Sequence, residues 1–144
     1  MSRNRGFSAA LEDFNKEVIK AAKGKWNRKY DKNNHRIFTV AGAYVQYNMY
    51  MDHNRWYENR MDYYAEYCQR MQDHYLLHYP ANHIGDKVGN NQHLGNCAEQ
   101  HACNKVLMAD DRLNVSAVHF TKAYRVRTAQ IVPYCDVCKK LFRL

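Results

Sequence analysis

Two short stretches are the most informative parts of this sequence: Cys97-Ala98-Glu99 and, further along the chain, Pro133-Tyr134-Cys135-Asp136-Val137-Cys138. Cysteine thiolates are zinc ligands, and a site with three protein ligands leaves the fourth tetrahedral position of the ion open for water. Glu99 lies two residues after the first cysteine, where its carboxylate is placed to move protons rather than to bind metal. The residues therefore predict a catalytic zinc site made by Cys97, Cys135 and Cys138, with Glu99 beside it.

This combination resembles the zinc-dependent nucleobase deaminase superfamily, in which [His/Cys]-x-Glu is followed by Pro-Cys-x-x-Cys. The resemblance is confined to about residues 95–142, and one residue, Tyr134, separates Pro133 from the cysteine pair. It implies that Zn2+ is the cofactor and that Glu99 carries protons while cytosine is converted to uracil. It also implies a cytidine-deaminase-like α/β fold, with three α-β-α layers and a small mixed sheet.

Two other interpretations of the cysteines remain open. A purely structural zinc site needs a fourth protein ligand, for which His93 and His101 are the candidates in the sequence. Cys135 and Cys138 also have the Cys-x-x-Cys spacing of a redox dithiol, although that interpretation leaves the Cys-Ala-Glu stretch unexplained.

Length and composition indicate one domain without a membrane anchor. The chain has 144 residues, a usual size for a single domain. We expect a deaminase domain over 1–144, with a mainly helical, tyrosine-rich region at 1–80 and the zinc-binding catalytic core at 81–144. No apolar run approaches the roughly 18 residues of a membrane span, and residues 1–25 contain no secretory signal. The metal site uses three of the five cysteines and leaves Cys68 and Cys103, so no disulfide framework is expected, which favours a reducing compartment. Cys68 and Cys103 are expected to be small buried side chains.

Apolar periodicity predicts most of the helices. We expect helices over 8–23, 55–78, 97–108 and 136–144, with Asn96 as the N-cap of the third. The expected buried face of the second helix comprises Met61, Tyr64, Cys68, Met71, Tyr75 and His78. Strands are expected over 113–120 and 131–132, with a polar stretch between them at 121–130 and a loop at 79–96. Either residues 37–50 supply further strands of the sheet, with the tyrosine-rich helix inserted after them, or the sheet is reduced.

The net charge of +8 is unevenly distributed along the chain. The net charge is +6 over residues 1–36, −3 over 37–103 and +5 over 104–144. Basic surface attracts phosphates and supplies most of the sequence-independent affinity for nucleic acids. Beside a nucleobase-deaminase site, this charge favours a nucleic acid as substrate, single-stranded rather than duplex, over a free nucleoside.

Several residues near the two motifs are candidates for substrate contacts. Asn91 and Asn96 are expected to hold the ribose or the edge of the base, and Ala98 adjoins the first ligand. Tyr134 is expected to stack on the base, with ordinary packing as the alternative. Arg125 and Arg127 alternate on a segment expected to be extended, where they can contact phosphates together or form a solvated face.

Free cytidine deaminases also use Cys-Ala-Glu with Cys-x-x-Cys, but they continue well past the second motif. Here Lys139-Lys140 follows and few residues remain. With its basic ends, the chain looks more like the C-terminal deaminase domains of bacterial polymorphic toxins. That resemblance implies delivery as part of a larger secreted toxin, action in the cytoplasm of the target cell and a cognate immunity protein. We also expect a monomer. The alternatives are a free cytidine or nucleoside deaminase and a non-catalytic, zinc-stabilised nucleic-acid-binding module.

Overall fold

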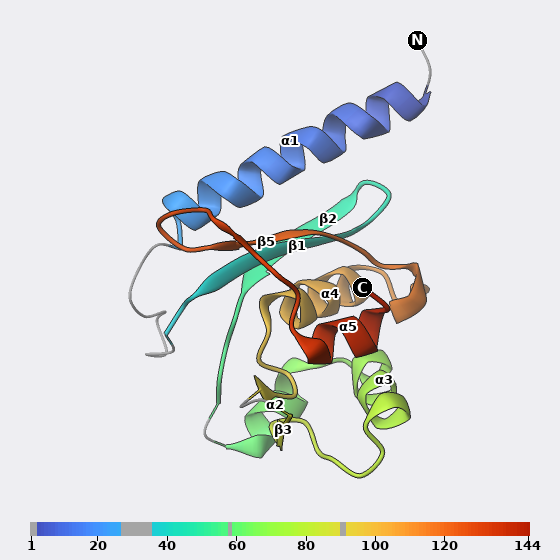
Figure 1. Cartoon of the computed structure of the whole chain (residues 1–144). Coiled ribbons are helices and arrows are strands. Elements are labelled where there is room, and N and C mark those ends of the chain that lie inside the picture. Colours follow the sequence, from blue (N-terminus) through green and yellow to red (C-terminus); the bar gives the residue numbers. More distant parts are fainter. Residues whose placement is uncertain (1–2, 27–35, 58, 90–91) are drawn as a thin grey trace.

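The computed structural model describes residues 3–26, 36–57, 59–89 and 92–144. In chain order, its elements are α1 (Arg3–Lys23), β1 (Thr39–Val45), β2 (Asn48–His53), α2 (Arg60–Glu66), α3 (Gln69–His78), β3 (Lys87–Val88), β4 (Gln92–His93), α4 (Ala98–Ala109), the 3-10 turn η1 (Val115–Ala117), β5 (His119–Arg125), β6 (Ile131–Val132) and α5 (Asp136–Phe142) (Figure 1). The expected α/β class is confirmed.

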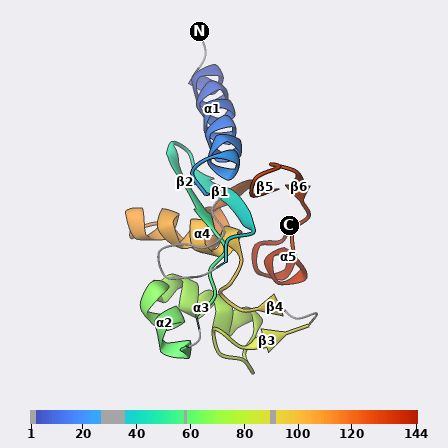
Figure 2. The same ribbon diagram turned by 90° about the vertical axis from the view of Figure 1, so that its left-hand side faces the viewer.

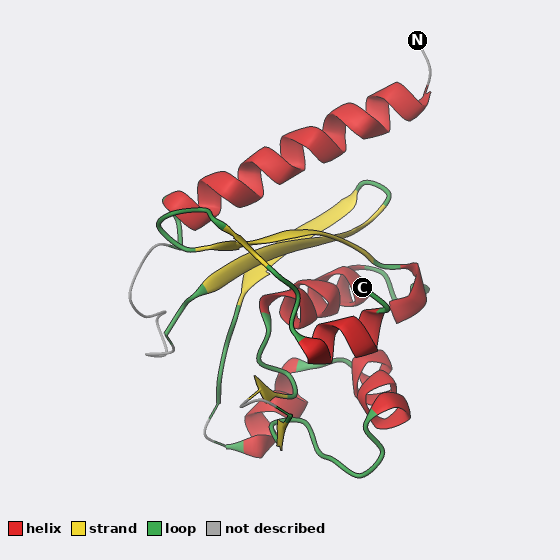
Figure 3. Cartoon of the chain, in the orientation of Figure 1, coloured by secondary structure: helices red, strands yellow, loops and turns green. Residues whose placement is uncertain are grey.

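The main sheet has four strands in the order β2-β1-β5-β6, and β3 pairs with β4 in a separate hairpin (Figure 3). Every pairing in the described part of the chain is antiparallel, so the expected mixed sheet is wrong. Short turns join β1 to β2 and β5 to β6, and strands joined by short turns run antiparallel. The central pair of β1 and β5, which lie far apart along the chain, is antiparallel as well. The first two strands come from residues 39–53, so the region before residue 80 supplies half of the main sheet as well as helices.

Helices cover both faces of the sheet. In Figures 1 and 2, α1 lies on one face and α4 on the other, with α5, α3 and α2 beyond α4. On the α1 side, Val18 and Ala22 pack with Val40 of β1 and Tyr124 of β5. On the α4 side, the small side chains of Ala41, Ala98 and Ala123 meet, which lets the first turn of α4 approach the strands closely. This second face carries the two cysteine motifs.

The helix expected at 8–23 is confirmed and begins earlier, at Arg3. Its apolar residues recur at steps of three and four, which places them on one stripe, and Val18 and Ala22 of this stripe are fully buried. The helices expected at 97–108 and 136–144 are found as α4 and α5 with small shifts at their ends. Within the described residues, none of these helices combines the length and the apolar character that crossing a membrane requires.

The single helix expected over 55–78 is wrong, because it is divided into α2 and α3. Cys68 is extended between the two helices, and its backbone N–H donates to Oδ1 of Asn104 in α4 at 2.9 Å. That bond takes the place of the intrahelical hydrogen bond that a continuous helix would make here. The helix α2 thus ends before Cys68, and α3 begins after it. As a result Met71 and Tyr75 are buried as expected, whereas Met61 is 66% exposed and Tyr63 is buried in its place.

The strand expected over 113–120 is also displaced along the chain. Residues 115–117 form the turn η1, and the strand β5 spans His119–Arg125 and so enters the stretch described above as polar. In β5 exposed and buried side chains are interleaved, and Thr121, Ala123 and Tyr124 are buried. A polar sequence therefore forms a central strand, because β1 and β6 pair with its two edges. The loop expected at 79–96 contains the hairpin of β3 and β4.

We expect Gly42→Ala to destabilise the protein by about 1–3 kcal/mol, as overpacking of a core usually does. A Cβ atom at Gly42 of β1 would lie 2.6 Å from Cε2 and 2.8 Å from Cζ of Phe14, whose ring lies between α1 and β1. Urea denaturation measures the change in the free energy of unfolding. Gly6→Ala is the matched control, since a Cβ there has its nearest neighbour at 3.7 Å and alanine favours a helix. Equal stability of the two variants would contradict this packing.

Candidate metal centre

The two cysteine motifs meet because two helices begin at the same place. Cys97 is the N-cap of α4 and Cys135 is the N-cap of α5, so the expected N-cap, Asn96, is wrong by one residue. The backbone N–H groups at such a helix start have no intrahelical acceptor and carry a partial positive charge. One of them, that of Cys138, donates to Sγ of Cys135 at 3.4 Å. Both helix starts thus favour negatively charged sulfur.

The three sulfur atoms form one compact group. Sγ of Cys97 lies 3.2 Å from Sγ of Cys135, and all three sulfurs lie within 4.8 Å of one another. A tetrahedral zinc ion with Zn–S bonds of about 2.3 Å holds its sulfurs roughly 3.8 Å apart. The chemistry and the spacing of the three donors therefore fit a metal ion.

The contacts among the three sulfurs favour ionisation of the Cys135 thiol and lower its pKa. Hydrogen bonds from Cys138 and Cys97 lower the pKa of the Cys135 thiol to about 3. Burial raises the pKa of the Cys138 thiol, and its hydrogen bond to Cys135 raises the pKa of the Cys97 thiol. Three thiolates at such close range need a positive charge among them.

Glu99 lies directly against this group. Its side chain is 4% exposed, and Sγ of Cys138 donates to its Oε2 atom at 3.4 Å. Burial raises the pKa of the Glu99 carboxyl, because desolvation disfavours the charged form. The sequence motif therefore places a buried carboxyl beside the sulfurs.

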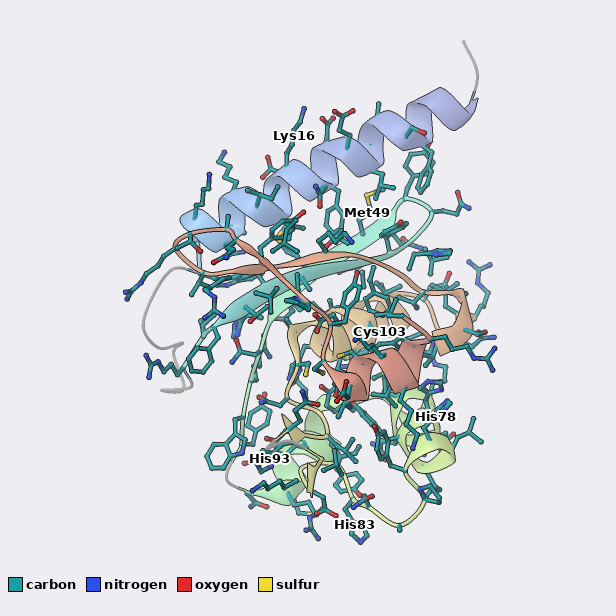
Figure 4. All side chains as sticks on the ribbon, viewed as in Figure 1. Lys16, Met49, His78, His83, His93 and Cys103 are labelled. Atoms are coloured by element: carbon teal, nitrogen blue, oxygen red, sulfur yellow. The ribbon has the colours of Figure 1, made fainter. Side chains whose placement is uncertain are left out.

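Neither histidine proposed as a fourth ligand joins the cluster. His101 is buried, and its ring stacks on Tyr67 at a centroid distance of 5.2 Å and lies 3.8 Å from a carboxylate oxygen of Glu66. His93 in β4 has its Nδ1 atom 3.0 Å from the carbonyl oxygen of Gly85, and Figure 4 shows it near the β3–β4 hairpin. Among the described residues, only three cysteines form a possible metal-binding group, which favours a site with an open position.

Gln100, which sequence reasoning missed, fixes the surroundings of the cluster. It is fully buried, and its Oε1 atom accepts hydrogen bonds from the Tyr75 hydroxyl at 2.6 Å and the Gly95 N–H at 2.7 Å. Its Nε2 atom donates to Sγ of Cys138 at 3.4 Å. One amide thus ties α3, the loop before α4 and α5 together. A glutamine next to Glu99 gives no sequence signal for this role.

A cavity of about 190 Å³ opens beside the sulfurs. It is lined by Phe38, Thr39, Asn54, Asn96, Cys97, Ala98, Glu99, Val132, Pro133 and Cys135. The Oδ1 atom of Asn96 is buried and accepts no hydrogen bond from any described residue. A buried acceptor without a partner is costly, and Asn96 is one of the residues that line the cavity.

Sequence reasoning missed Asn54, which also lines this cavity. Oδ1 of Asn54 accepts from the N–H groups of Phe38 and Thr39 at 2.7 and 3.0 Å, and its Nδ2 atom donates to the carbonyl oxygen of Arg36 at 2.8 Å. This amide holds the chain where it enters β1. A polar residue just after a strand was the only signal in the sequence, and nothing there connects it to the cysteines.

The structure brings some of the predicted substrate contacts together and leaves others apart. Asn96 and Ala98 line the cavity, whereas Tyr134 does not, and the Tyr134 hydroxyl donates to the carbonyl oxygen of Thr121 at 2.7 Å. Arg125 ends β5 and is exposed, and Arg127 has a positive φ of 76° in the turn that follows. Asn91 lies outside the described residues.

Comparison with protein-family models, with curated proteins and with solved structures finds no match for this chain.

Proposed function

We propose that this protein is a zinc-dependent hydrolytic deaminase that converts cytosine to uracil in nucleic acid. The observation that carries the proposal is the joint placement of three sulfurs within 4.8 Å and a buried carboxyl that lines the same cavity as two of them. A purely structural zinc site would have no need of an adjoining cavity with a proton carrier in its wall.

Cys97, Cys135 and Cys138 would hold the ion. A bound zinc ion supplies Lewis-acid activation of water, whose pKa it lowers to about 7. Glu99 takes a proton from the attacking water and delivers it to ring nitrogen N3, while a bond forms between the water oxygen and C4 of cytosine. Glu99 then carries the second proton to the amino group, the bond from C4 to nitrogen breaks, and ammonia leaves. Proton transfer by a placed carboxyl contributes typically about 10²–10⁴-fold to the rate.

Asn96 supports this assignment from the substrate side. Its buried Oδ1 atom has no partner among the described residues and can accept a hydrogen bond from a bound nucleotide. Val132 and Pro133 add apolar side chains to the lining of the cavity, as suits the face of a base.

The resemblance to polymorphic toxins extends the proposal to the biological role. The domain would be delivered into a rival cell as part of a larger protein, and a cognate immunity protein would neutralise it. The net charge of +8 suits a polyanionic substrate, because cationic surface accelerates and strengthens association with phosphates.

The test is to incubate zinc-loaded protein with single-stranded DNA, duplex DNA, RNA and free cytidine, and to measure uracil by mass spectrometry. Uracil in a polymer is the expected result. Uracil from free cytidine alone would replace the proposal with a nucleoside deaminase. If none of the four substrates yields uracil although zinc is bound, the next measurement is inosine. Inosine would indicate an adenine deaminase, and its absence would indicate a non-catalytic zinc module.

A further inference from the structure

Three segments meet at the end of the sheet that borders the cavity, and they carry basic residues without any acid. The N–H of Arg127 donates to the carbonyl oxygen of Ala22 at 3.0 Å, and the N–H of Val126 donates to that of Phe38 at 2.9 Å. Figure 1 shows the C-terminal end of α1 beside the turn between β5 and β6. Residues 20–26, 36–40 and 122–133 contain no Asp or Glu, and their basic members are Lys20, Lys23, Lys25, Arg36, Lys122, Arg125 and Arg127.

Strand alternation places Arg125 on the cavity side of the sheet. Side chains two residues apart in a strand share a face, and Ala123 packs on Ala98 of α4, so Arg125 shares that face. Its partner across the ladder is Thr39, which lines the cavity. The Arg125 guanidinium therefore extends from the strand directly beside the cavity rather than toward α1.

Phe38 provides a flat apolar surface at the same place. Phe38 is one of the residues that line the cavity, and its side chain is 46% exposed. The guanidinium carbon of Arg36 lies 5.0 Å from the centre of the ring, a cation–π contact that orients both groups. An exposed aromatic ring flanked by cations is the arrangement with which proteins hold unpaired nucleotides.

We propose that Arg36, Phe38 and Arg125 form a binding site for the nucleotide that adjoins the target cytosine in a single strand. The ring stacks on the neighbouring base, and the two guanidinium groups contact the phosphates on either side of the base that enters the cavity. This inference rests on the proposed function and narrows its substrate class to unpaired polymers, because a base within a duplex presents no free face to Phe38.

The test measures binding of a fluorescein-labelled single-stranded oligonucleotide by anisotropy across a series of salt concentrations. All proteins carry zinc and Glu99→Gln, which keeps the oligonucleotide intact. We expect Arg36→Gln with Arg125→Gln to weaken binding at least tenfold at low salt. The slope of log K against log salt is expected to fall by about 0.7 for each phosphate that the variant no longer neutralises. Phe38→Ala is expected to weaken binding about fivefold or more, with rescue by Phe38→Tyr.

Lys16→Gln is the matched control for the removal of positive charge. Lys16 lies on the outer side of α1, away from the sheet (Figure 4), with a side chain 68% exposed. We expect its variant to bind as the parent does. Equal affinities for Lys16→Gln and for the double arginine variant, or an oligonucleotide that the parent does not bind, would overturn the proposal.

The single-strand site and the proposed function can fail independently, and the two experiments distinguish these cases. If the unsubstituted protein forms no uracil, yet removal of the arginines and of Phe38 weakens binding as expected, the deaminase fails and the single-strand site stands. If the unsubstituted protein forms uracil in an oligonucleotide, yet the double arginine variant and Phe38→Ala bind that oligonucleotide as tightly as the parent does, the proposed function stands and the single-strand site is overturned.

Discussion

Glu99→Gln is expected to reduce cytosine deamination by at least about 10²–10⁴-fold while the protein retains one zinc ion per chain. Glutamine has nearly the same shape, so the wall of the cavity and the contact with Cys138 are preserved. It cannot accept a proton from water or deliver one to the base, and the Glu99 carboxyl is the only acid among the described residues that line the cavity. Uracil formation in a single-stranded oligonucleotide measures the rate, and metal analysis measures the zinc.

Glu12→Gln is the control for this substitution, because that carboxylate lies on the solvent side of α1 with a side chain 71% exposed. We expect it to have the activity of the parent. Turnover by Glu99→Gln within a few fold of the parent would show that the carboxyl does not carry protons in the reaction. A loss of zinc in the same variant would instead assign Glu99 to metal binding.

Cys97→Ser is expected to abolish stoichiometric zinc binding and, with it, the stabilisation that the metal provides. A serine hydroxyl is not ionised near neutral pH, so the site would be left with two of its three anionic donors. A ligand present at 100 times its Kd stabilises the folded state by about 2.7 kcal/mol. Thermal unfolding with zinc and with a chelator is therefore expected to differ for the parent and to coincide for the variant.

Cys68→Ser is the matched control for the removal of a thiol. Cys68 precedes α3 and lies outside the sulfur cluster, and serine is a favourable N-cap. We expect this variant to bind one zinc ion and to show the same chelator-dependent shift as the parent. Undiminished zinc binding by Cys97→Ser would contradict the proposed ligand set.

The sequence predicts the parts of this molecule that depend on local spacing. The stripe of Phe14, Val18 and Ala22 specifies α1, and the two cysteine motifs lie at the starts of α4 and α5, where helices were expected. The same motifs were enough to predict the sulfur cluster and the carboxyl beside it. Each of these features is encoded within a few residues, or by two short motifs with a specific chemistry.

Features that depend on distant contacts could not be predicted in this way. The break before α3 is made by Asn104, 36 residues from Cys68, with no proline or glycine at the break to signal it. The turn between β1 and β2 contains Gln46 with a φ of 52°, a conformation that asparagine or glycine usually marks. Phe38 and Asn54 line the cavity because pairing of β1 with β2 brings the start of one strand beside the end of the other.

The position of β5 between β1 and β6 also has a consequence for the order of events during folding. The N–H of Gly42 donates to the hydroxyl of Thr121, 79 residues later, at 2.9 Å. Strand pairs so far apart in sequence must close a long loop before any contact rewards it, and proteins rich in such pairs fold slowly, in milliseconds to seconds. Because Cys97 and Cys135 lie on either side of β5 along the chain, metal uptake is expected to follow this slow step rather than to nucleate it.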